Sequence, residues 1–349
     1  MHHGAAAGND SYVVELECDD GVTGWGECAM LGAFYSEAFA SGTAAGIIEL
    51  APHLVGLDAS QPRTVMHHLD GVMLGQQYVK TAIDIAVCDA AARGAGRPLC
   101  DMLGGRLVES IPVYNVVIAG GNAAGAALLA ERLVGEGYRR LQVKVGHDPV
   151  GDAHRLREVR AAVGDDIVLF ADANGGFNTG EAREFLRRTH DLDFTFEQPC
   201  ATLDECIAIR GACNHPMVLD ESMESVADLL RAHRSGVADG ITIKLGRVGG
   251  PTAAALMRNI ACELGLLVSV ESIGGAAINM AAYLHVAVGV PARLVGHTVD
   301  FPSWVTVDNA TGLPAPADGV QALPDPTVAG LGITVDRDAL GQPLIDIGR

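Results

Sequence analysis

The segment LQVKVGHD, residues 141–148, has the pattern of a buried β-strand that carries a lysine near its end. Side chains alternate between the two faces of a strand. One face therefore carries Leu141, Val143 and Val145, and the other carries Gln142 and Lys144. A polar pair that includes an ammonium group indicates that the second face serves something other than ordinary core packing.

Short apolar runs of this kind recur along the chain, and a stretch with helical character follows each of them. The runs occupy residues 112–118, 141–145, 167–172, 194–198, 217–220, 240–245, 266–271 and 292–296. Eight strands that alternate with helices are typical of an α/β fold of the (β/α)8, or TIM-type, barrel class. The alternative is a doubly wound open sheet, but no GxGxxG turn follows the first run. We therefore predict a barrel.

Ionisable residues stand at the same end of six consecutive runs. They are Lys144, Asp172, Glu197, Asp220, Lys244 and Glu271. In a barrel, active-site groups come from the carboxyl ends of the strands, so one ionisable residue per repeat brings all six to one mouth. A single such residue is more often a helix cap or a solvated loop charge, but six in phase indicate a functional site.

Three of the six are carboxylates on successive strands. Like charges at close range raise one another's pKa unless something neutralises them. Two lysines carry too little positive charge to neutralise three carboxylates, and lysines used in this way would not be free for chemistry. A divalent cation does, and an all-oxygen donor set suits Mg²⁺. We predict that the metal ligands are Asp172, Glu197 and Asp220.

The two lysines fall on the second and sixth strands, which are roughly opposite in an eight-stranded ring. A partly desolvated lysine near a divalent ion can act as a base. Lys144 and Lys244 are therefore predicted to be catalytic, and the reaction is abstraction of a proton next to a carboxylate, with the metal stabilising the enediolate. Two opposed lysines permit epimerisation and equally permit loss of a β leaving group.

The composition excludes several other classes of protein. The chain has 349 residues, 49% hydrophobic and 19% charged, and its net charge is −19. Scattered Lys and Arg offer no basic surface to nucleic acid or to an anionic membrane. No apolar run reaches the roughly 18 residues of a membrane span. The eight cysteines form no CxxC pair, and the start MHHGAAAGNDS lacks a secretory signal. We expect a cytoplasmic protein with a truncated or tag-scarred N-terminus.

A different pattern precedes the barrel. The segment YVVELECDDGVTGWGE (12–27) contains two β-like runs around a DG turn, which is typical of a hairpin. Apolar residues then recur at helical spacing within 79–96, and a glycine pair at 104–105 marks a boundary. We predict an α+β domain over 1–106, a barrel over 107–325 and a C-terminal tail over 326–349.

Longer motifs coincide with these positions. They are DDGVTGWGE (19–27), AIDIAVCDAAARGAGRPLCDMLGG (82–105), KVG (144–146), DAN (172–174), EQP (197–199), DES (220–222), KLGRVGG (244–250) and GLGI (330–333). Through them the chain resembles the enolase superfamily, and within it the muconate-lactonising-enzyme subgroup. The resemblance implies that the N-terminal cap, completed by the C-terminal tail, covers the barrel mouth and selects a small-molecule carboxylate substrate. It also implies one Mg²⁺ per subunit, with Mn²⁺ as a substitute, and a homo-oligomer between dimer and octamer.

Departures from the family pattern narrow the chemistry. The mandelate-racemase subgroup uses a His–Asp base, whereas this chain has Lys244 on strand six and Glu271 on strand seven. Subgroup relatives carry Lys-x-Lys on strand two, whereas this chain has Gln142 before Lys144. The Gln variant is similar to enzymes of proline derivatives, such as cis-3-hydroxy-L-proline dehydratases and 4-hydroxyproline betaine 2-epimerases. The family's first cap strand is expected to be missing before Tyr12.

The residues that follow the seventh predicted strand help to indicate the class of substrate. Many of these enzymes carry Trp-Gly-Gly there, whereas this chain has Ile273 before the two glycines. Ile273 offers no aromatic face to a quaternary ammonium. The sequence therefore favours a proline or amino-acid ammonium that pairs with Glu271 over a betaine.

Further side chains are candidates for lining or supporting the site. The predicted substrate contacts are Tyr35, Tyr78, Gln142 and Glu271. Packing aromatics are the alternative for the two tyrosines. Asn174 and Glu221 are predicted to orient the ligands, with solvated loop polarity as the alternative.

A Mg²⁺-dependent dehydratase or epimerase of a proline derivative is the leading prediction. The same residues fit an N-acyl amino acid racemase, a dipeptide epimerase or a muconate-type cycloisomerase. Two alternatives come from other classes of protein. One is an aldolase-like barrel in which a lysine forms a Schiff base with substrate, and the other is a non-catalytic binding protein.

Overall fold

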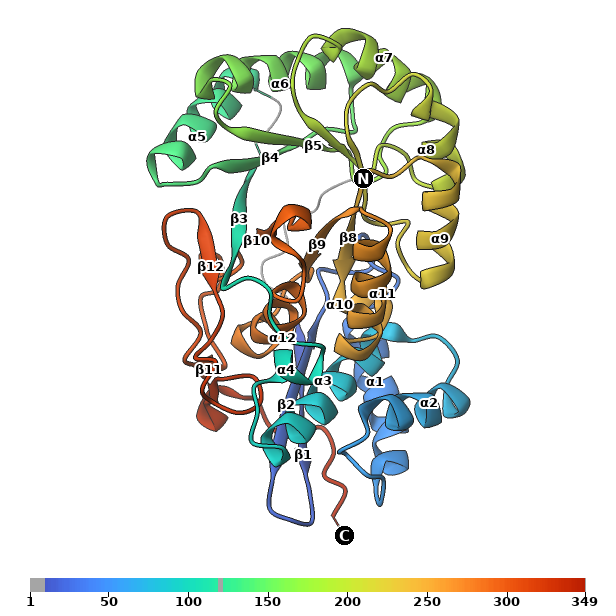
Figure 1. Cartoon of the computed structure of the whole chain (residues 1–349), viewed down its shortest axis with the longest axis vertical. Coiled ribbons are helices and arrows are strands. Elements are labelled where there is room, and N and C mark those ends of the chain that lie inside the picture. The colour runs from blue at the N-terminus through green and yellow to red at the C-terminus, as the bar shows by residue number, and fades with distance from the viewer. Residues whose placement is uncertain (1–9, 119–121, 349) are drawn as a thin grey trace.

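The computed structural model describes residues 10–118 and 122–348. The expectations about the extreme N-terminus fall on residues 1–9 and lie outside the described part. The chain forms an α+β cap, drawn in blue, beside a barrel whose green and yellow helices arch over the opposite end of the molecule (Figure 1).

The cap begins with an antiparallel hairpin of β1 (Ser11–Glu17) and β2 (Thr23–Ala29), as the sequence predicts. The turn includes Gly21 at φ +83°, a left-handed conformation that glycine adopts without steric cost. The helices that follow are α1 (Ala40–Leu50), the 3-10 helix η1 (Ala51–Leu54), α2 (Pro62–Val72), α3 (Gln77–Gly94) and α4 (Leu99–Met102). Helix α3 is buried along most of its length and forms the centre of the cap.

Two glycines of β2 allow α3 to lie directly on the strand. A Cβ atom at Gly24 would stand 2.1 Å from the backbone oxygen of Ala86, and one at Gly26 would stand 1.9 Å from that of Ala82. Real Cβ contacts are essentially never shorter than 3.0 Å. The TGWGE motif therefore preserves a close approach between strand and helix.

We expect Gly26→Ala to lower the free energy of unfolding by about 3 kcal/mol, because the added methyl group must displace the backbone of α3. The measurement is urea unfolding followed by circular dichroism. Gly71→Ala is the matched control, since Gly71 lies in α2 and a Cβ there meets nothing within 4 Å. That variant should be unchanged or stabilised by up to about 1 kcal/mol. Equal unfolding midpoints for the two variants would contradict the packing argument.

Eight parallel strands form the barrel. They are β3 (Ser110–Val117), β4 (Arg140–Lys144), β5 (Val168–Asp172), β6 (Thr195–Glu197), β7 (Met217–Leu219), β8 (Gly240–Lys244), β9 (Leu267–Glu271) and β10 (Thr298–Val299). Their order is β10-β3-β4-β5-β6-β7-β8-β9. The N–H of Gly296, just before β10, donates to the carbonyl of Val268 in β9 at 2.9 Å and closes the ring. The predicted barrel is confirmed.

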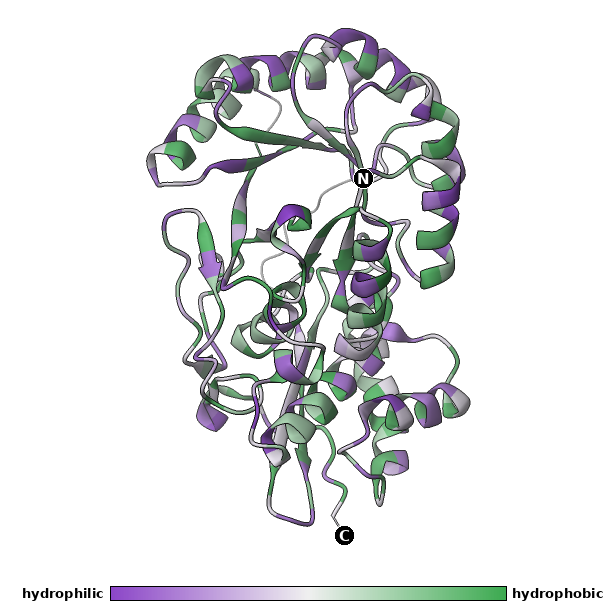
Figure 2. Ribbon diagram, in the orientation of Figure 1, coloured by the Kyte–Doolittle hydropathy of each residue, from purple (hydrophilic) through white to green (hydrophobic). Residues whose placement is uncertain are grey.

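Helices surround the strands on the outside. They are α5 (Ala123–Gly135), α6 (Pro149–Val163), α7 (Thr179–Thr189), α8 (Leu203–Arg210), α9 (Val226–Ser235), α10 (Leu245–Val248) with α11 (Pro251–Glu263), and α12 (Ala277–Ala287). The strands are largely hydrophobic in colour, whereas α5 to α9 carry many hydrophilic positions (Figure 2). In the part of the chain that the structure describes, no helix combines the length and apolar character needed to cross a bilayer.

The eighth strand lies later than the sequence predicts. Residues 292–296 form the 3-10 helix η2 (Ala292–Leu294) and one bridge at Val295, and the strand itself is β10. Among the described residues no α-helix follows β10. The remaining elements are β11 (Ala310–Thr311), β12 (Val320–Ala322), β13 (Thr334–Val335) and the 3-10 helix η3 (Arg337–Ala339). The strand predicted at 292–296 does not form, because Pro291 starts a 3-10 helical turn there.

The C-terminal segment, here residues 300–348, contacts both the cap and the rest of the barrel. Its strand β12 pairs antiparallel with β3 of the barrel. The N–H of Leu331 donates to Asp89 of α3 at 2.8 Å. The ring of His285 in α12 accepts from the N–H of Cys100 at 3.1 Å and lies 3.1 Å from the carbonyl of Leu331. Cap, barrel and C-terminal segment therefore meet around one buried histidine.

A buried carboxylate also links the cap to the barrel. Glu27 of β2 accepts hydrogen bonds from the N–H groups of Ala276 and Asn279 at the start of α12, each at 3.0 Å. A carboxylate at a helix N-terminus satisfies backbone donors and complements the helix dipole. The same contact fixes the loop that joins α12 to the end of β9.

We expect Glu27→Gln to lower the free energy of unfolding by about 2 kcal/mol, because the amide removes the charge and leaves a backbone N–H unpaired. Thermal unfolding provides the measurement. Glu17→Gln is the control, since Glu17 is an exposed residue at the end of β1. An effect no larger than that of the control would show that this contact contributes little.

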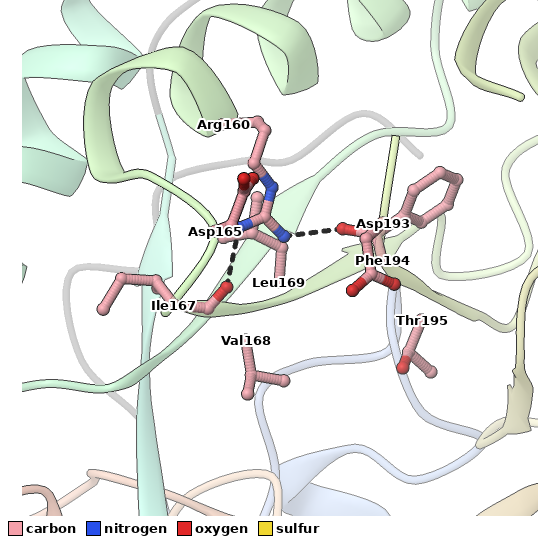
Figure 3. A pocket seen from close by; sticks show the side chains of 8 residues that line it. All are labelled: Arg160, Asp165, Ile167, Val168, Leu169, Asp193, Phe194 and Thr195. Carbon is pink, nitrogen blue, oxygen red and sulfur yellow. Dashed lines mark hydrogen bonds between the residues drawn. The ribbon is translucent and has the colours of Figure 1, made fainter. Parts of the chain in front are cut away.

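A buried arginine holds the barrel together at the amino ends of its strands. The guanidinium of Arg160 in α6 donates to the carbonyls of Ile167 at 2.8 Å and Asp193 at 2.6 Å, and Figure 3 shows both bonds beside a small pocket. The two carbonyls precede β5 and β6. In barrels this end serves stability, whereas the carboxyl ends of the strands carry the chemistry.

Candidate active site

The strand register brings the predicted ionisable residues to one level of the barrel. In the sheet, Lys144 is paired with Asp172, Asp172 with Glu197, and Lys244 with Glu271. Asp220 follows the last residue of β7 directly. The structure therefore gathers all six side chains at the carboxyl ends of the strands, where an active site is expected.

Lys144 is held by two groups of the neighbouring strand. Its Nζ atom lies 2.5 Å from Asp172 Oδ2 and 3.0 Å from Asn174 Oδ1. Asn174 also donates to Glu221 Oε1 at 3.0 Å. The backbone of Asn174 has φ +43°, a conformation that is uncommon outside glycine and clusters at functional sites. The structure thus places Asn174 beside Lys144, and Glu221 beside Asn174.

Lys244 is more deeply enclosed. Its Nζ atom lies 3.0 Å from Asp220 Oδ2, 3.9 Å from Glu271 Oε1 and 3.2 Å from the hydroxyl of Tyr35. Burial alone opposes its charged form, but the Asp220 carboxylate and further acidic groups raise the pKa of Lys244 well above its ordinary value. In this arrangement Lys244 is an ammonium group.

Arg247 is a contact of the site that the sequence analysis missed. Its Nη1 atom donates to Asp220 Oδ1 at 2.6 Å and to the Asp220 carbonyl at 2.9 Å. Although burial opposes the carboxylate, Lys244 and then Arg247 lower the pKa of Asp220 to about 2. The available signal was the position of Arg247, about one helical turn after Lys244 in KLGRVGG.

Glu197 lies between the two other predicted ligands and is held by neutral donors. The amide of Gln142 donates to Glu197 Oε2 at 2.9 Å, and the hydroxyl of Thr242 donates to Oε1 at 3.2 Å. Burial, followed by the charges of Asp172 and Asp220, raises the pKa of Glu197 well above its ordinary value. Gln142 therefore contacts a predicted ligand, although the sequence assigned it to the substrate.

The two carboxylate oxygens of Glu271 have different surroundings. The hydroxyl of Tyr114, on β3, donates to Glu271 Oε2 at 2.9 Å. The other oxygen, Oε1, is buried and accepts no hydrogen bond from the described residues. Tyr114 was also missed from the sequence, because an aromatic residue within an apolar strand has the appearance of ordinary core.

The two candidate tyrosines of the cap lie close together. Tyr35 and Tyr78 pack with Met30 and Ile273 in one small apolar cluster. Tyr35 reaches Lys244, as described above. Tyr78 packs against Gly246, where a Cβ atom would stand 2.6 Å from its ring. The structure thus brings both tyrosines to the Lys244 side of the mouth.

A histidine of the barrel interior lies beneath these groups. The ring of His297, just before β10, meets the rings of Tyr114 and Phe170 edge-on, with centroids 4.6 Å and 4.2 Å away. Burial lowers the pKa of His297 to about 3. The imidazole is therefore neutral and fills the barrel interior together with the two aromatic rings.

The predicted ligands fit Mg²⁺ by their chemistry. Asp172, Glu197 and Asp220 supply only oxygen donors from adjacent strands, and the repulsion felt by Glu197 is what a divalent cation would offset. Within the described residues, no three His, Cys, Asp or Glu side chains converge at metal-binding distances. Lys144 and Lys244 instead pair with Asp172 and Asp220. The ligand assignment stays a prediction.

Two family models match the sequence. The mandelate racemase / muconate lactonizing enzyme N-terminal domain matches residues 4–104, and the enolase C-terminal domain-like model matches residues 125–339. This chain belongs to the enolase superfamily. The resemblance that the sequence motifs indicated is confirmed.

Relatives in the superfamily catalyse related reactions. The cis-3-hydroxy-L-proline dehydratase of Roseibium aggregatum is 35% identical over 338 residues, covering 96% of this chain and 90% of that enzyme. The N-succinyl-L-Arg/Lys racemase of Bacillus cereus is 28% identical over 291 residues, covering 82% and 79%. A superfamily member from Roseovarius nubinhibens ISM, solved in complex with magnesium, has a TM-score of 0.92 at 33% identity and covers 97% and 91%. This chain is therefore an enzyme of a superfamily branch with dehydratases, racemases and cycloisomerases.

Proposed function

We propose that this enzyme binds Mg²⁺ and removes the α-proton of a proline-derived amino-acid carboxylate, followed by loss of a β-hydroxyl group or return of the proton to carbon. The observation that carries the proposal is the placement of Lys144 and Lys244 at either end of the carboxylate series Asp172, Glu197 and Asp220. The magnesium complex of a relative at 33% identity supports the metal.

The two lysines hold and move protons at their Nζ atoms. They project from β4 and β8, the second and sixth strands of the ring, so a substrate between them presents each face of Cα to one lysine. In epimerisation one lysine takes the α-proton and the other delivers a proton to the opposite face. In dehydration one takes the α-proton and an ammonium protonates the departing hydroxyl group, which leaves as water. Mg²⁺, when bound, stabilises negative charge that develops on the substrate carboxylate.

The proline-like substrate is supported by the surroundings of Glu271. Its buried Oε1 atom has no hydrogen-bond donor in the described part of the chain, and an unsatisfied buried acceptor of this kind costs about 1–3 kcal/mol. A secondary ammonium supplies both the donor and the opposite charge. Two residues after Glu271, Ile273 belongs to an apolar cluster with Met30 and Tyr78, which is suited to ring methylene groups. The 35% identity to a cis-3-hydroxy-L-proline dehydratase supports the same substrate class.

A substrate panel tests this proposal. The enzyme with MgCl2 in D2O is incubated with both enantiomers of proline, the 3- and 4-hydroxyprolines, proline betaine, N-succinyl arginine and dipeptides. NMR then measures deuterium at Cα and any unsaturated product. We expect turnover of a free proline derivative and its abolition by EDTA. Turnover of N-acylated amino acids or dipeptides alone would contradict the proposed proline-derived substrate. It would indicate an N-acyl amino acid racemase or a dipeptide epimerase.

A lysine-derived Schiff base is tested with a keto acid, whose ketone can condense with a lysine amine and lose water. The chain has only three lysines, Lys80, Lys144 and Lys244, so peptide mass spectrometry would locate any adduct that borohydride reduction traps. We expect no adduct and full sensitivity to EDTA. A trapped adduct together with resistance to EDTA would favour the aldolase-like alternative.

A further inference from the structure

The Lys244 ammonium is held by both parts of the molecule. An ammonium group has three N–H donors. Two of its neighbours, Asp220 and Glu271, belong to the barrel, whereas the Tyr35 hydroxyl at 3.2 Å comes from the cap. Lys144 differs, because its hydrogen-bond partners among the described residues, Asp172 and Asn174, both belong to the barrel.

The barrel contacts of Lys244 are shared or long. Asp220 also accepts a hydrogen bond from Arg247 at 2.6 Å and is a predicted metal ligand. The distance from Lys244 Nζ to Glu271 Oε1, 3.9 Å, is longer than a hydrogen bond. The Tyr35 hydroxyl therefore accepts a hydrogen bond from Lys244 without occupying a carboxylate that the metal or the substrate ammonium is proposed to use.

Tyr35 is itself fixed in place. Its N–H donates to the carbonyl of Gly32 at 3.0 Å, and its side chain packs against the cluster that contains Tyr78 and Ile273. The ring centroid lies 5.7 Å from Lys244 Nζ, within the range of a cation–π contact. Hydroxyl and ring therefore act on the same ammonium group.

We propose that Tyr35 is a positioning residue through which the cap fixes the Lys244 ammonium, whereas the described residues that hold Lys144 all belong to the barrel. Tyr35 thereby acts on one of the two lysines and not directly on the substrate. The consequence is an asymmetry between the two faces of the substrate Cα, and this consequence rests on the function proposed above.

Competitive amine labelling tests the contact without any turnover. The enzyme is treated with limiting acetic anhydride, and the modification of Lys244 is divided by that of Lys144 within each sample. We expect Tyr35→Phe to raise this ratio about tenfold, because a hydrogen bond to a charged group is lost while the ring stays. Tyr12→Phe is the matched control, since Tyr12 packs on the same cluster and its variant should leave the ratio unchanged. An unchanged ratio in Tyr35→Phe overturns the proposal.

Exchange at Cα provides the second test. Lys244→Ala first identifies which substrate enantiomer loses its α-proton to Lys244. Tyr35→Phe should then shift the exchange ratio of the two enantiomers about tenfold in the same direction. Equal slowing of both enantiomers, or no slowing, would show that Tyr35 only supports the fold or the substrate. Absence of exchange in the wild type would refute the proposed function, whereas the labelling ratio would still decide the role of Tyr35.

Discussion

Replacing Lys144 with arginine is expected to lower kcat for α-proton exchange by about 10³-fold, within the range that a positioned acid or base contributes. Arginine keeps the positive charge that faces Asp172 but does not release its proton near neutral pH. No other amine replaces it on that strand, because the preceding inward residue is Gln142. KM should change little, since the lost interaction acts on the reacting proton and not on ground-state binding.

The third lysine of the chain provides the control. Lys80→Arg makes the same chemical change in the cap, where Lys80 pairs with Asp70 at 2.6 Å. That variant should retain wild-type kcat. Thermal unfolding of both variants checks that the Lys144→Arg protein is folded. A folded Lys144→Arg enzyme with wild-type kcat would remove Lys144 from the proposed chemistry.

The positions of Lys144 and of the three carboxylates followed from sequence because barrel geometry repeats. Each parallel strand enters the sheet in the same direction, so residues at equivalent ends meet without any specific long-range signal. The observed register, which pairs Lys144 with Asp172 and Asp172 with Glu197, is the result of that repetition. Their proximity was therefore predictable from sequence.

The contacts that were missed depend on tertiary structure. Arg247 reaches Asp220 from the short helix α10, and strand-end counting does not consider helical residues. The bond from Lys244 to Tyr35 joins residues that are 209 positions apart, one in the cap and one in the barrel. Neither periodicity nor spacing carries information about how a loop of one domain lies against the strands of another.

The displaced eighth strand has a local cause. The apolar run at 292–296 is as hydrophobic as a short strand, but it follows Pro291 and turns into η2. The true strand, β10, has only two residues and is preceded by His297. That histidine packs against Tyr114 and Phe170 inside the barrel. Because a polar residue precedes the strand at an interior position, the apolar pattern that predicts a strand is absent there.

When Mg²⁺ is added, the order of stability of the wild type and a Glu197→Gln variant is expected to reverse. Without metal, the variant should be at least as stable as the wild type, because a neutral amide replaces a buried carboxyl group whose ionisation is opposed by burial and by its acidic neighbours, and its oxygen still accepts a hydrogen bond from Gln142 or Thr242. With Mg²⁺ at about 100 times its Kd, the wild type gains about 2.7 kcal/mol. The variant gains little, because losing a direct ligand should weaken binding by more than the 10–100-fold that outer contacts contribute.

Thermal unfolding with and without MgCl2, together with calorimetric titration of Mg²⁺, measures both halves of this expectation, and kcat should fall with the lost metal. Glu131→Gln, an exposed change on α5, should behave as the wild type in both conditions. The informative result is that the variant is at least as stable as the wild type without Mg²⁺ and less stable than the wild type with it. A general folding defect would instead lower the stability of the variant in both conditions. If Mg²⁺ stabilised Glu197→Gln as much as the wild type, Glu197 would not be a ligand, and the repulsion at the centre of the site would need another explanation.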